Sequence, residues 1–240
     1  MKKEFSFVAA GARTDVVVGE GALASLGARL PSIAPGRWFL VSSKRIFLLH
    51  GHLLSAGGAE RVLSKEPLFV PDGEKAKTWS VLGRLIEQLV RRGLRRDGGV
   101  VCLGGGTVGD VGGMAAALAL RGVPVVQAPT TLLAACDSAL GGKTAVDLPQ
   151  GKNLAGAFHA PRLVLADTAV LDTLPERAFR SGLAEVVKTS FLDARFHRAM
   201  ARLAGPLASR EGAAVAEAVF RSLRVKAAVV SADPFETSGV

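Results

Sequence analysis

The stretch GGVVCLGGGTVGDVGGMAAALAL, residues 98–120, decides the fold class of this 240-residue chain. An apolar run leads into the glycine turn GGGTVGD, and a run of small residues follows it. Gly104, Gly106 and Gly109 have the G-x-G-x-x-G spacing, which lets backbone N–H groups approach a pyrophosphate at a helix N-terminus. The stretch predicts a strand, a phosphate-binding turn and a helix. A structural turn that binds no ligand stays open as the alternative.

The glycine turn differs from the fingerprint of standard dinucleotide-binding dehydrogenases. That fingerprint opens the first strand–helix unit and carries an acidic residue about 20 positions later. Here the turn lies near residue 104, and the stretch RGVPVVQAPT at 121–130 contains no acid. The pattern disfavours a standard Rossmann dehydrogenase, so another segment must hold the ribose.

Outward from the turn, apolar runs alternate with helical patterns, which favours an open α/β sheet. A helix is predicted to start near Thr78, where Val81, Leu82, Leu85 and Leu89 recur at helical spacing. Five segments read as strands, at residues 38–43, 61–70, 98–103, 124–128 and 162–167.

Beyond Pro175 the strand signals stop. The segments at 175–192 and 212–233 have helical patterns. We therefore expect a Rossmann-like α/β domain at residues 1–158, followed by an all-α region at residues 159–240.

Composition limits the classes of partner. The net charge is +9, but the only dense basic run, at residues 91–96, closes a helical segment and has no interleaved aromatic residues. This argues against nucleic acid and favours a small anion. Cys102 and Cys136 have no metal-ligand spacing. No apolar run is long enough for a secretory signal or a membrane span, so we expect a cytoplasmic protein with no membrane partner.

Two polar segments are candidates for ligand binding. PDGEKAK at 71–77 is a turn whose Glu74 could bind ribose hydroxyls and whose Lys77 could bind phosphate, although it also reads as a solvated turn. The segment at 129–158 sets Asp137, Lys143 and Lys152 among glycines and small apolar residues. Lysines beside glycines leave room for an anion, which favours an anion site over a loop without function.

Glu185 and Lys188 have i,i+3 spacing on one predicted helix face. The pattern is typical of a helical ion pair, but a helix-borne carboxylate is also an ordinary zinc ligand. One carboxylate cannot form a zinc site. We interpret the four histidines, at positions 50, 52, 159 and 197, as surface or packing residues.

The motifs DGEKAK, GGGTVGD, LRGVP, QAPTTLLAACDSALGGKTAV, GKNLAGAF and SGLAEVVK resemble the 3-dehydroquinate synthases in order, spacing and wording. The resemblance implies a homodimer with an N-terminal NAD domain, a C-terminal helical domain that binds metal and substrate, and the substrate between them. It implies conversion of the sugar phosphate 3-deoxy-D-arabino-heptulosonate 7-phosphate to 3-dehydroquinate and phosphate, in the shikimate pathway. Transient oxidation by NAD, phosphate elimination, reduction and aldol closure are the implied steps.

The resemblance also assigns residues. The implied NAD contacts are Asp72, Gly73, Glu74, Lys75, Ala76, Lys77, Gly105, Gly106, Thr107, Val108, Gly109, Asp110, Thr130, Thr131, Lys143, Lys152 and Thr173. The implied substrate contacts are Arg121, Asp137, Lys143, Asn153, Lys188 and Lys226, with Arg121 reaching across the dimer to a phosphate. Asp137, Lys188 and Glu236 are the implied catalytic residues, Glu236 as proton acceptor. Glu185 is the implied ligand of a zinc or cobalt ion.

Some positions depart from the family pattern. Ala178 stands where an acid is usual, and Val41, Ser42 and Ser43 replace an Asp or Asn near the adenosine. The family continues past Glu236 with an arginine, an asparagine and two histidine ligands, so we expect a C-terminally truncated chain with an incomplete helical domain.

The sequence leaves other functions open. The chain could be another sugar-phosphate cyclase, or an inactive NAD-binding fragment if it ends at Val240. Iron-dependent alcohol dehydrogenases share the broad fold but need no pair of glycine-flanked lysines around a phosphate.

Overall fold

The computed structural model describes residues 2–55 and 57–238. Its main sheet has the strand order β1-β2-β9-β6-β5-β3-β4. All neighbouring strands are parallel except β1 and β2, which form an antiparallel hairpin. The strands of this sheet are β1 (Lys3–Ala9), β2 (Ala12–Val18), β3 (Trp38–Ser43), β4 (Leu68–Val70), β5 (Gly99–Gly104), β6 (Val125–Pro129) and β9 (Leu163–Ala166).

A second, two-stranded sheet is an antiparallel hairpin of β7 (Lys143–Leu148) and β8 (Gly151–Phe158). The helices are α1 (Leu26–Ile33), α2 (Lys44–His50), α3 (His52–Ser55), α4 (Trp79–Arg91), α5 (Gly106–Leu118), α6 (Glu176–Ser190), α7 (Ala194–Ala208) and α8 (Gly212–Ala232). Among the described residues no helix is both long and apolar enough to cross a membrane.

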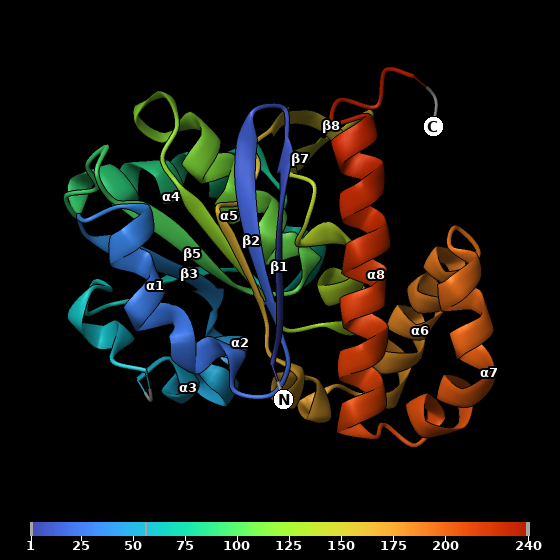
Figure 1. Ribbon diagram of the computed structural model, residues 1–240. Helices are drawn as coiled ribbons and strands as arrows, with labels where there is room; N and C mark the ends of the chain where they lie inside the picture. The colour runs from blue at the N-terminus through green and yellow to red at the C-terminus, as the bar shows by residue number, and fades with distance from the viewer. Residues whose placement is uncertain (1, 56, 239–240) are drawn as a thin grey trace.

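The two faces of the main sheet carry separate apolar cores. On one face α4 and α5 cover β3, β5 and β6, and Val146 of β7 joins this core. On the other face the core extends from β2 and β9 into the helical region of α6–α8. Figure 1 shows α8 standing between the β1–β2 hairpin and the pair α6 and α7.

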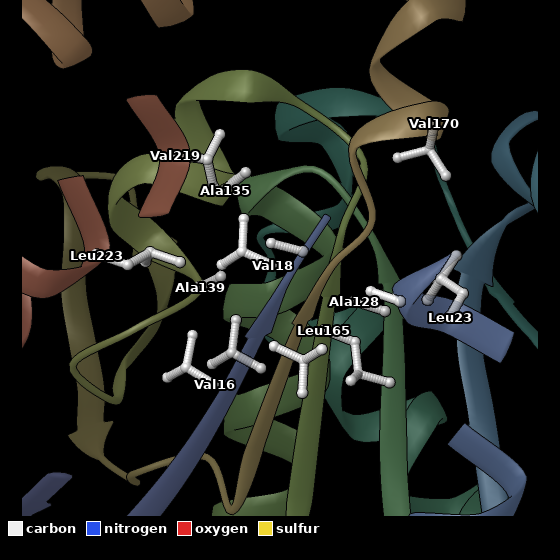
Figure 2. Close-up of a cluster of buried hydrophobic side chains, with 14 of the residues drawn as sticks. Val16, Val18, Leu23, Ala128, Ala135, Ala139, Leu165, Val170, Val219 and Leu223 are labelled. Atoms are coloured by element: carbon white, nitrogen blue, oxygen red, sulfur yellow. The ribbon is translucent and has the colours of Figure 1, made fainter. Parts of the chain in front are cut away.

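Side chains of α8 are buried directly beside the sheet. In Figure 2, Val219 and Leu223 of α8 lie beside Ala135 and Ala139, Val18 of the sheet lies next to these alanines, and Val16 and Leu165 lie below them. Full burial of a valine or leucine side chain stabilises the fold by roughly 1.5–3 kcal/mol. The helical region is therefore fixed to the sheet through the segment that links β6 to β7.

Most of the predicted architecture is confirmed. The strand at 38–43 has the predicted bounds, and β5, its glycine turn and α5 follow the predicted order. The helix near Thr78 is α4, and the Thr78 side chain accepts a hydrogen bond from the N–H of Val81 at 3.2 Å. Beyond Pro175 the chain is helical, as expected.

Some predictions were wrong or incomplete. The strand predicted at 61–70 is strand only at Leu68–Val70, because Lys65, Glu66 and Pro67 interrupt it and Pro67 has no N–H to donate. The hairpins β1–β2 and β7–β8 were not predicted. The domain boundary after residue 158 stays a prediction. Because β9 follows it and lies inside the main sheet, residues from both predicted domains build that sheet.

Candidate active site

The glycine turn presents the N-terminus of α5. Strand β5 ends at Gly104, whose carbonyl accepts a hydrogen bond from the N–H of Thr130 at 2.9 Å. Gly105 is the N-cap and has no side chain to satisfy the first N–H groups of the 13-residue helix. A Cβ on Gly106 would lie 3.1 Å from Ser138 Oγ, so glycine keeps this approach open. The turn can therefore receive an anionic group at the helix N-terminus.

Two buried hydroxyls beside the turn fit a bound dinucleotide. Among the described residues, Thr130 Oγ1 and Ser138 Oγ are buried and have no hydrogen-bond partner. A buried polar group without a partner costs stability, and a ligand oxygen can satisfy it. Thr131 lies against the same turn, with its Cγ2 3.1 Å from a Cβ built on Gly105. The glycine turn and the hydroxyls beside it thus fit the pyrophosphate of NAD.

The turn at 72–77 lies near α5 but directs its buried lysine inward. The Lys77 side chain is 5% exposed, and its Nζ lies 2.7 Å from the Asp110 carboxylate. It also donates a hydrogen bond to the Asn153 side chain. The other side chains of the turn are exposed except that of Ala76, and Lys152 lies 3.5 Å from Glu74. The ammonium of Lys77 is therefore bound to protein acceptors, and a phosphate contact for it stays a prediction.

A cavity of about 470 Å³ brings many of the predicted residues together. It lies between the β7–β8 hairpin, α5, the segment after β6 and the C-terminal end of α8. The predicted site residues that line it are Asp110, Asp137, Lys143, Asn153, Lys226 and Glu236. These come from segments up to 126 positions apart in sequence, from Asp110 to Glu236.

Ion pairs neutralise the cations of the cavity. Lys226 pairs with Asp137, and Lys143 pairs with Glu236. Burial raises the pKa of the Asp110 carboxyl, and the hydrogen bond and charge of Lys77 offset part of that rise. An anionic ligand can therefore bind the lysines of the cavity. In doing so it displaces the carboxylates that pair with these lysines.

A second cavity, of about 500 Å³, lies at the amino ends of β2 and β6. Its lining is mainly apolar and includes Phe7, Phe158 and Phe235, with Arg162 and His159 as the charged or titratable side chains. The ring of His159 is already bonded to the carbonyl of Val123 at 2.8 Å. This cavity contains none of the predicted site residues, so the polar cavity is the better candidate.

The α6 helix carries Glu185 and Lys188 outside the lining of the polar cavity. The two side chains form an ion pair at 2.8 Å, and this hydrogen bond raises the pKa of Lys188. Within residues 2–55 and 57–238, no group of three or more His, Cys, Asp or Glu side chains could hold a metal ion. Glu185 alone does not fit a metal site, and its assignment as a ligand stays a prediction.

The remaining predicted residues lie apart from the cavity. Arg121 is exposed on a turn and has a φ of +67°. Thr173 Oγ1 lies 3.1 Å from His50 Nε2. The two serines that depart from the family pattern form hydrogen bonds within the protein. Ser42 donates to the Leu103 carbonyl at 2.7 Å, and Ser43 caps α2. Ala178 lies half-buried in α6.

Sequence reasoning missed Ser138, Thr144 and Asp147. Ser138 and Thr144 line the cavity, and Asp147 accepts a hydrogen bond from the backbone of Asn153 at 2.8 Å. Ser138 directly follows Asp137 within the motif CDSALGGKT, and that adjacency was an available signal. No sequence signal marks Asp147, because its partners become neighbours only when the hairpin folds.

Comparisons with known proteins identify the family of the chain. A family model described as 3-dehydroquinate synthase N-terminal matches residues 67–181, and one described as 3-dehydroquinate synthase C-terminal matches residues 182–240. A 3-dehydroquinate synthase of Bradyrhizobium sp. (strain BTAi1) is 46% identical over 233 residues, which are 96% of this chain and 61% of that relative. The chain spans about 60% of the length of the curated relatives it matches.

Two solved structures have a similar fold. A 2-deoxy-scyllo-inosose synthase complexed with carbaglucose-6-phosphate, NAD+ and Co2+ has a TM-score of 0.84 at 26% identity, covering 99% of this chain and 66% of that one. A 2-epi-5-epi-valiolone synthase from Streptomyces hygroscopicus with NAD+ and Zn2+ bound has a TM-score of 0.80 at 27% identity, covering 94% and 63%.

Proposed function

Because this chain belongs to the 3-dehydroquinate synthase family, we propose that it converts 3-deoxy-D-arabino-heptulosonate 7-phosphate to 3-dehydroquinate and phosphate. The observation that carries the proposal is the cavity of about 470 Å³. Two lysines, three carboxylates and an asparagine converge there from α5, the segment after β6, the β7–β8 hairpin, α8 and the residues that follow α8. This lining suits a substrate that bears both a phosphate and a carboxylate.

The glycine turn forms the cofactor side of the proposed site. NAD+, when bound, accepts a hydride from a substrate carbinol carbon and later returns it. The free N–H groups at the start of α5 and the hydroxyls of Thr130 and Ser138 hold the pyrophosphate. Asp110, in the next turn of α5, lies in the cavity lining, where it would meet the bound cofactor.

Lysines form the substrate side. Lys143, Lys226 and, from α6, Lys188 bind the anionic groups of the substrate, and Asn153 orients one of its hydroxyls. When the substrate anions engage Lys226 and Lys143, their present partners Asp137 and Glu236 become free to accept protons. Glu236 is the proposed proton acceptor. Its carboxylate is exposed at the cavity, and it becomes free when its partner Lys143 binds the substrate.

A divalent cation, zinc or cobalt, is part of the proposal, with Glu185 as one ligand. The support is the Co2+ and Zn2+ in two structurally similar synthases, together with the helix-borne position of Glu185. The described residues supply no further group of ligands around it. No step of the reaction is therefore assigned to the metal.

We further propose a cytoplasmic homodimer in which Arg121 reaches the partner's substrate phosphate. Its support is that Arg121 is exposed, on a turn outside the cavity of its own subunit. Analytical ultracentrifugation of the protein and of an Arg121→Ala variant tests this part. A monomer at micromolar concentration contradicts it.

Phosphate release from the heptulosonate phosphate tests the proposed reaction. We expect release that needs NAD+ and that is lost in a Lys143→Ala variant which still folds. No release from the folded protein, with NAD+ and zinc or cobalt present, overturns it.

One observation favours a second candidate function, which is NAD binding without turnover. No described group of three side chains could hold the metal. Saturable NAD+ binding without phosphate release would support this candidate.

A further inference from the structure

Lys77 joins three segments that lie on both sides of the proposed site. Its ammonium, on the turn after β4, bonds to Asp110 of α5 at 2.7 Å and to the Asn153 side chain of β8. The Nζ atom is also 3.9 Å from Asp147 Oδ1 of β7. This group of four side chains, hereafter the Lys77 junction, connects the cofactor turn to the substrate hairpin.

Asp147 holds the junction through both its backbone and its side chain. Its N–H donates to the Lys77 carbonyl at 2.9 Å, and its carboxylate accepts the N–H of Asn153 at 2.8 Å. The register of the hairpin shifts between Val146 and Leu148: Val146 pairs with Ala155 and Leu148 with Gly151, so residues 152–154 of β8 lie opposite Asp147 alone. Extra residues in one strand redirect its side chains out of the normal alternation, and here Asn153 is one of them.

Asn153 depends on this contact for its conformation. Its φ is +59°, in the left-handed region, which asparagine tolerates better than most non-glycine residues. The hydrogen bond from its N–H to the Asp147 carboxylate holds the backbone in this conformation. In this conformation the Asn153 side chain lies at both Lys77 and the cavity.

We propose that Asp147, which is outside the cavity lining, is a positioning residue for the proposed reaction: it fixes Asn153 at the substrate and ties Lys77 to the hairpin. This inference rests on the proposed function. The acceptor oxygen matters more than the charge, because the Asp147 carboxylate accepts the Asn153 N–H at 2.8 Å but lies 3.9 Å from the ammonium.

Calorimetric titration of the heptulosonate phosphate into the NAD+-loaded protein tests the inference. Asp147→Ala should weaken substrate binding about tenfold, or about 1.4 kcal/mol. Asp147→Asn keeps an acceptor oxygen and should bind within about threefold of the unaltered protein. Gln150→Ala, at the exposed tip of the same hairpin, is the matched control.

Two outcomes of the titration would overturn the proposal. In the first, Asp147→Ala binds the substrate as tightly as the unaltered protein and differs only in a lower melting temperature. That result would leave Asp147 a purely structural role. Failure of Asp147→Asn to restore affinity would contradict the acceptor argument.

Hydrogen exchange separates this inference from the proposed function. The Asn153 amide should be protected in the unaltered protein and in Asp147→Asn, and should exchange faster in Asp147→Ala. If the unaltered protein does not bind the sugar phosphate, the proposed function fails. Unchanged exchange of that amide in Asp147→Ala would refute the positioning role independently.

Discussion

The lysine of the Lys77 junction and the lysines at the open side of the site differ mainly in exposure. Each pairs with a carboxylate, but the Lys77 side chain is 5% exposed whereas Lys143 and Lys188 are 54% and 66% exposed. Charges attract more strongly where water is excluded, and exposed pairs contribute only about 0–1 kcal/mol. The buried lysine therefore holds the framework, and the exposed lysines can exchange their partners for a ligand.

Removing the buried ammonium gives the largest expected effect. Lys77→Met leaves the carboxylates of Asp110 and Asp147 without their cation and should lower the free energy of unfolding by about 3 kcal/mol. Urea denaturation measures this change. Lys152→Met is the matched control, because its exposed side chain pairs with the exposed Glu74, and it should change stability by less than about 0.5 kcal/mol. Equal losses of stability in the two variants would show that burial does not distinguish Lys77 from the exposed lysines.

A side chain placed in the glycine turn should weaken NAD+ binding without lowering the stability of the protein. A Cβ at Gly106 enters the space beside Ser138 Oγ, so Gly106→Ala should weaken NAD+ binding at least tenfold, or about 1.4 kcal/mol. Alanine also favours the helix, so the melting temperature should not fall. Gly83→Ala, in α4 where an added Cβ meets no atom within 4 Å, is the matched control. Unchanged NAD+ affinity in Gly106→Ala would place the cofactor elsewhere.

The junction should also give the protein a small pH dependence. Burial raises the pKa of Asp110 above 3.8, so the folded protein binds more protons than the unfolded chain between 3.8 and the raised pKa. The free energy of unfolding attributable to Asp110 therefore falls as pH rises through that window and is constant above it. Asp110→Asn should remove this part of the slope in denaturation curves measured from pH 4 upward. An identical slope in the variant would contradict the shift.

The exposed pair on α6 should contribute least to stability. Lys188→Ala should change the free energy of unfolding by no more than about 0.5 kcal/mol, because the Lys188 side chain is 66% exposed, although that of Glu185 is 15% exposed. Thermal and urea denaturation both measure this. A loss of more than about 1.5 kcal/mol would show that this lysine belongs with Lys77 and not with the exposed group.

Sequence patterns predicted the parts of the fold that depend on local residues. Apolar runs marked β3, β5 and β6, the helical spacing after Thr78 marked α4, and glycines marked the turn before α5. The β1–β2 hairpin was missed because its first strand alternates half-buried and exposed residues, and the β7–β8 hairpin because glycines and lysines interrupt its apolar pattern.

Contacts distant in sequence could not be predicted from local patterns. Lys77 was interpreted as a phosphate ligand because it lies in a polar turn, but its partners are 33 to 76 positions away and bury it. The pairing of Asp137 with Lys226 spans 89 positions. Family resemblance supplied most of the polar residues that line the cavity, whereas Asp147 became apparent only from its neighbours in space.

A crystal structure of this protein with NAD+ tests the central claim most directly. The account predicts the pyrophosphate at the N-terminus of α5, within hydrogen-bond distance of the Gly106 and Thr107 N–H groups and of the Thr130 or Ser138 hydroxyl. The nicotinamide should face the cavity that Asp137 and Lys143 line. NAD+ bound away from this turn, or no NAD+ at millimolar concentration, would contradict the account.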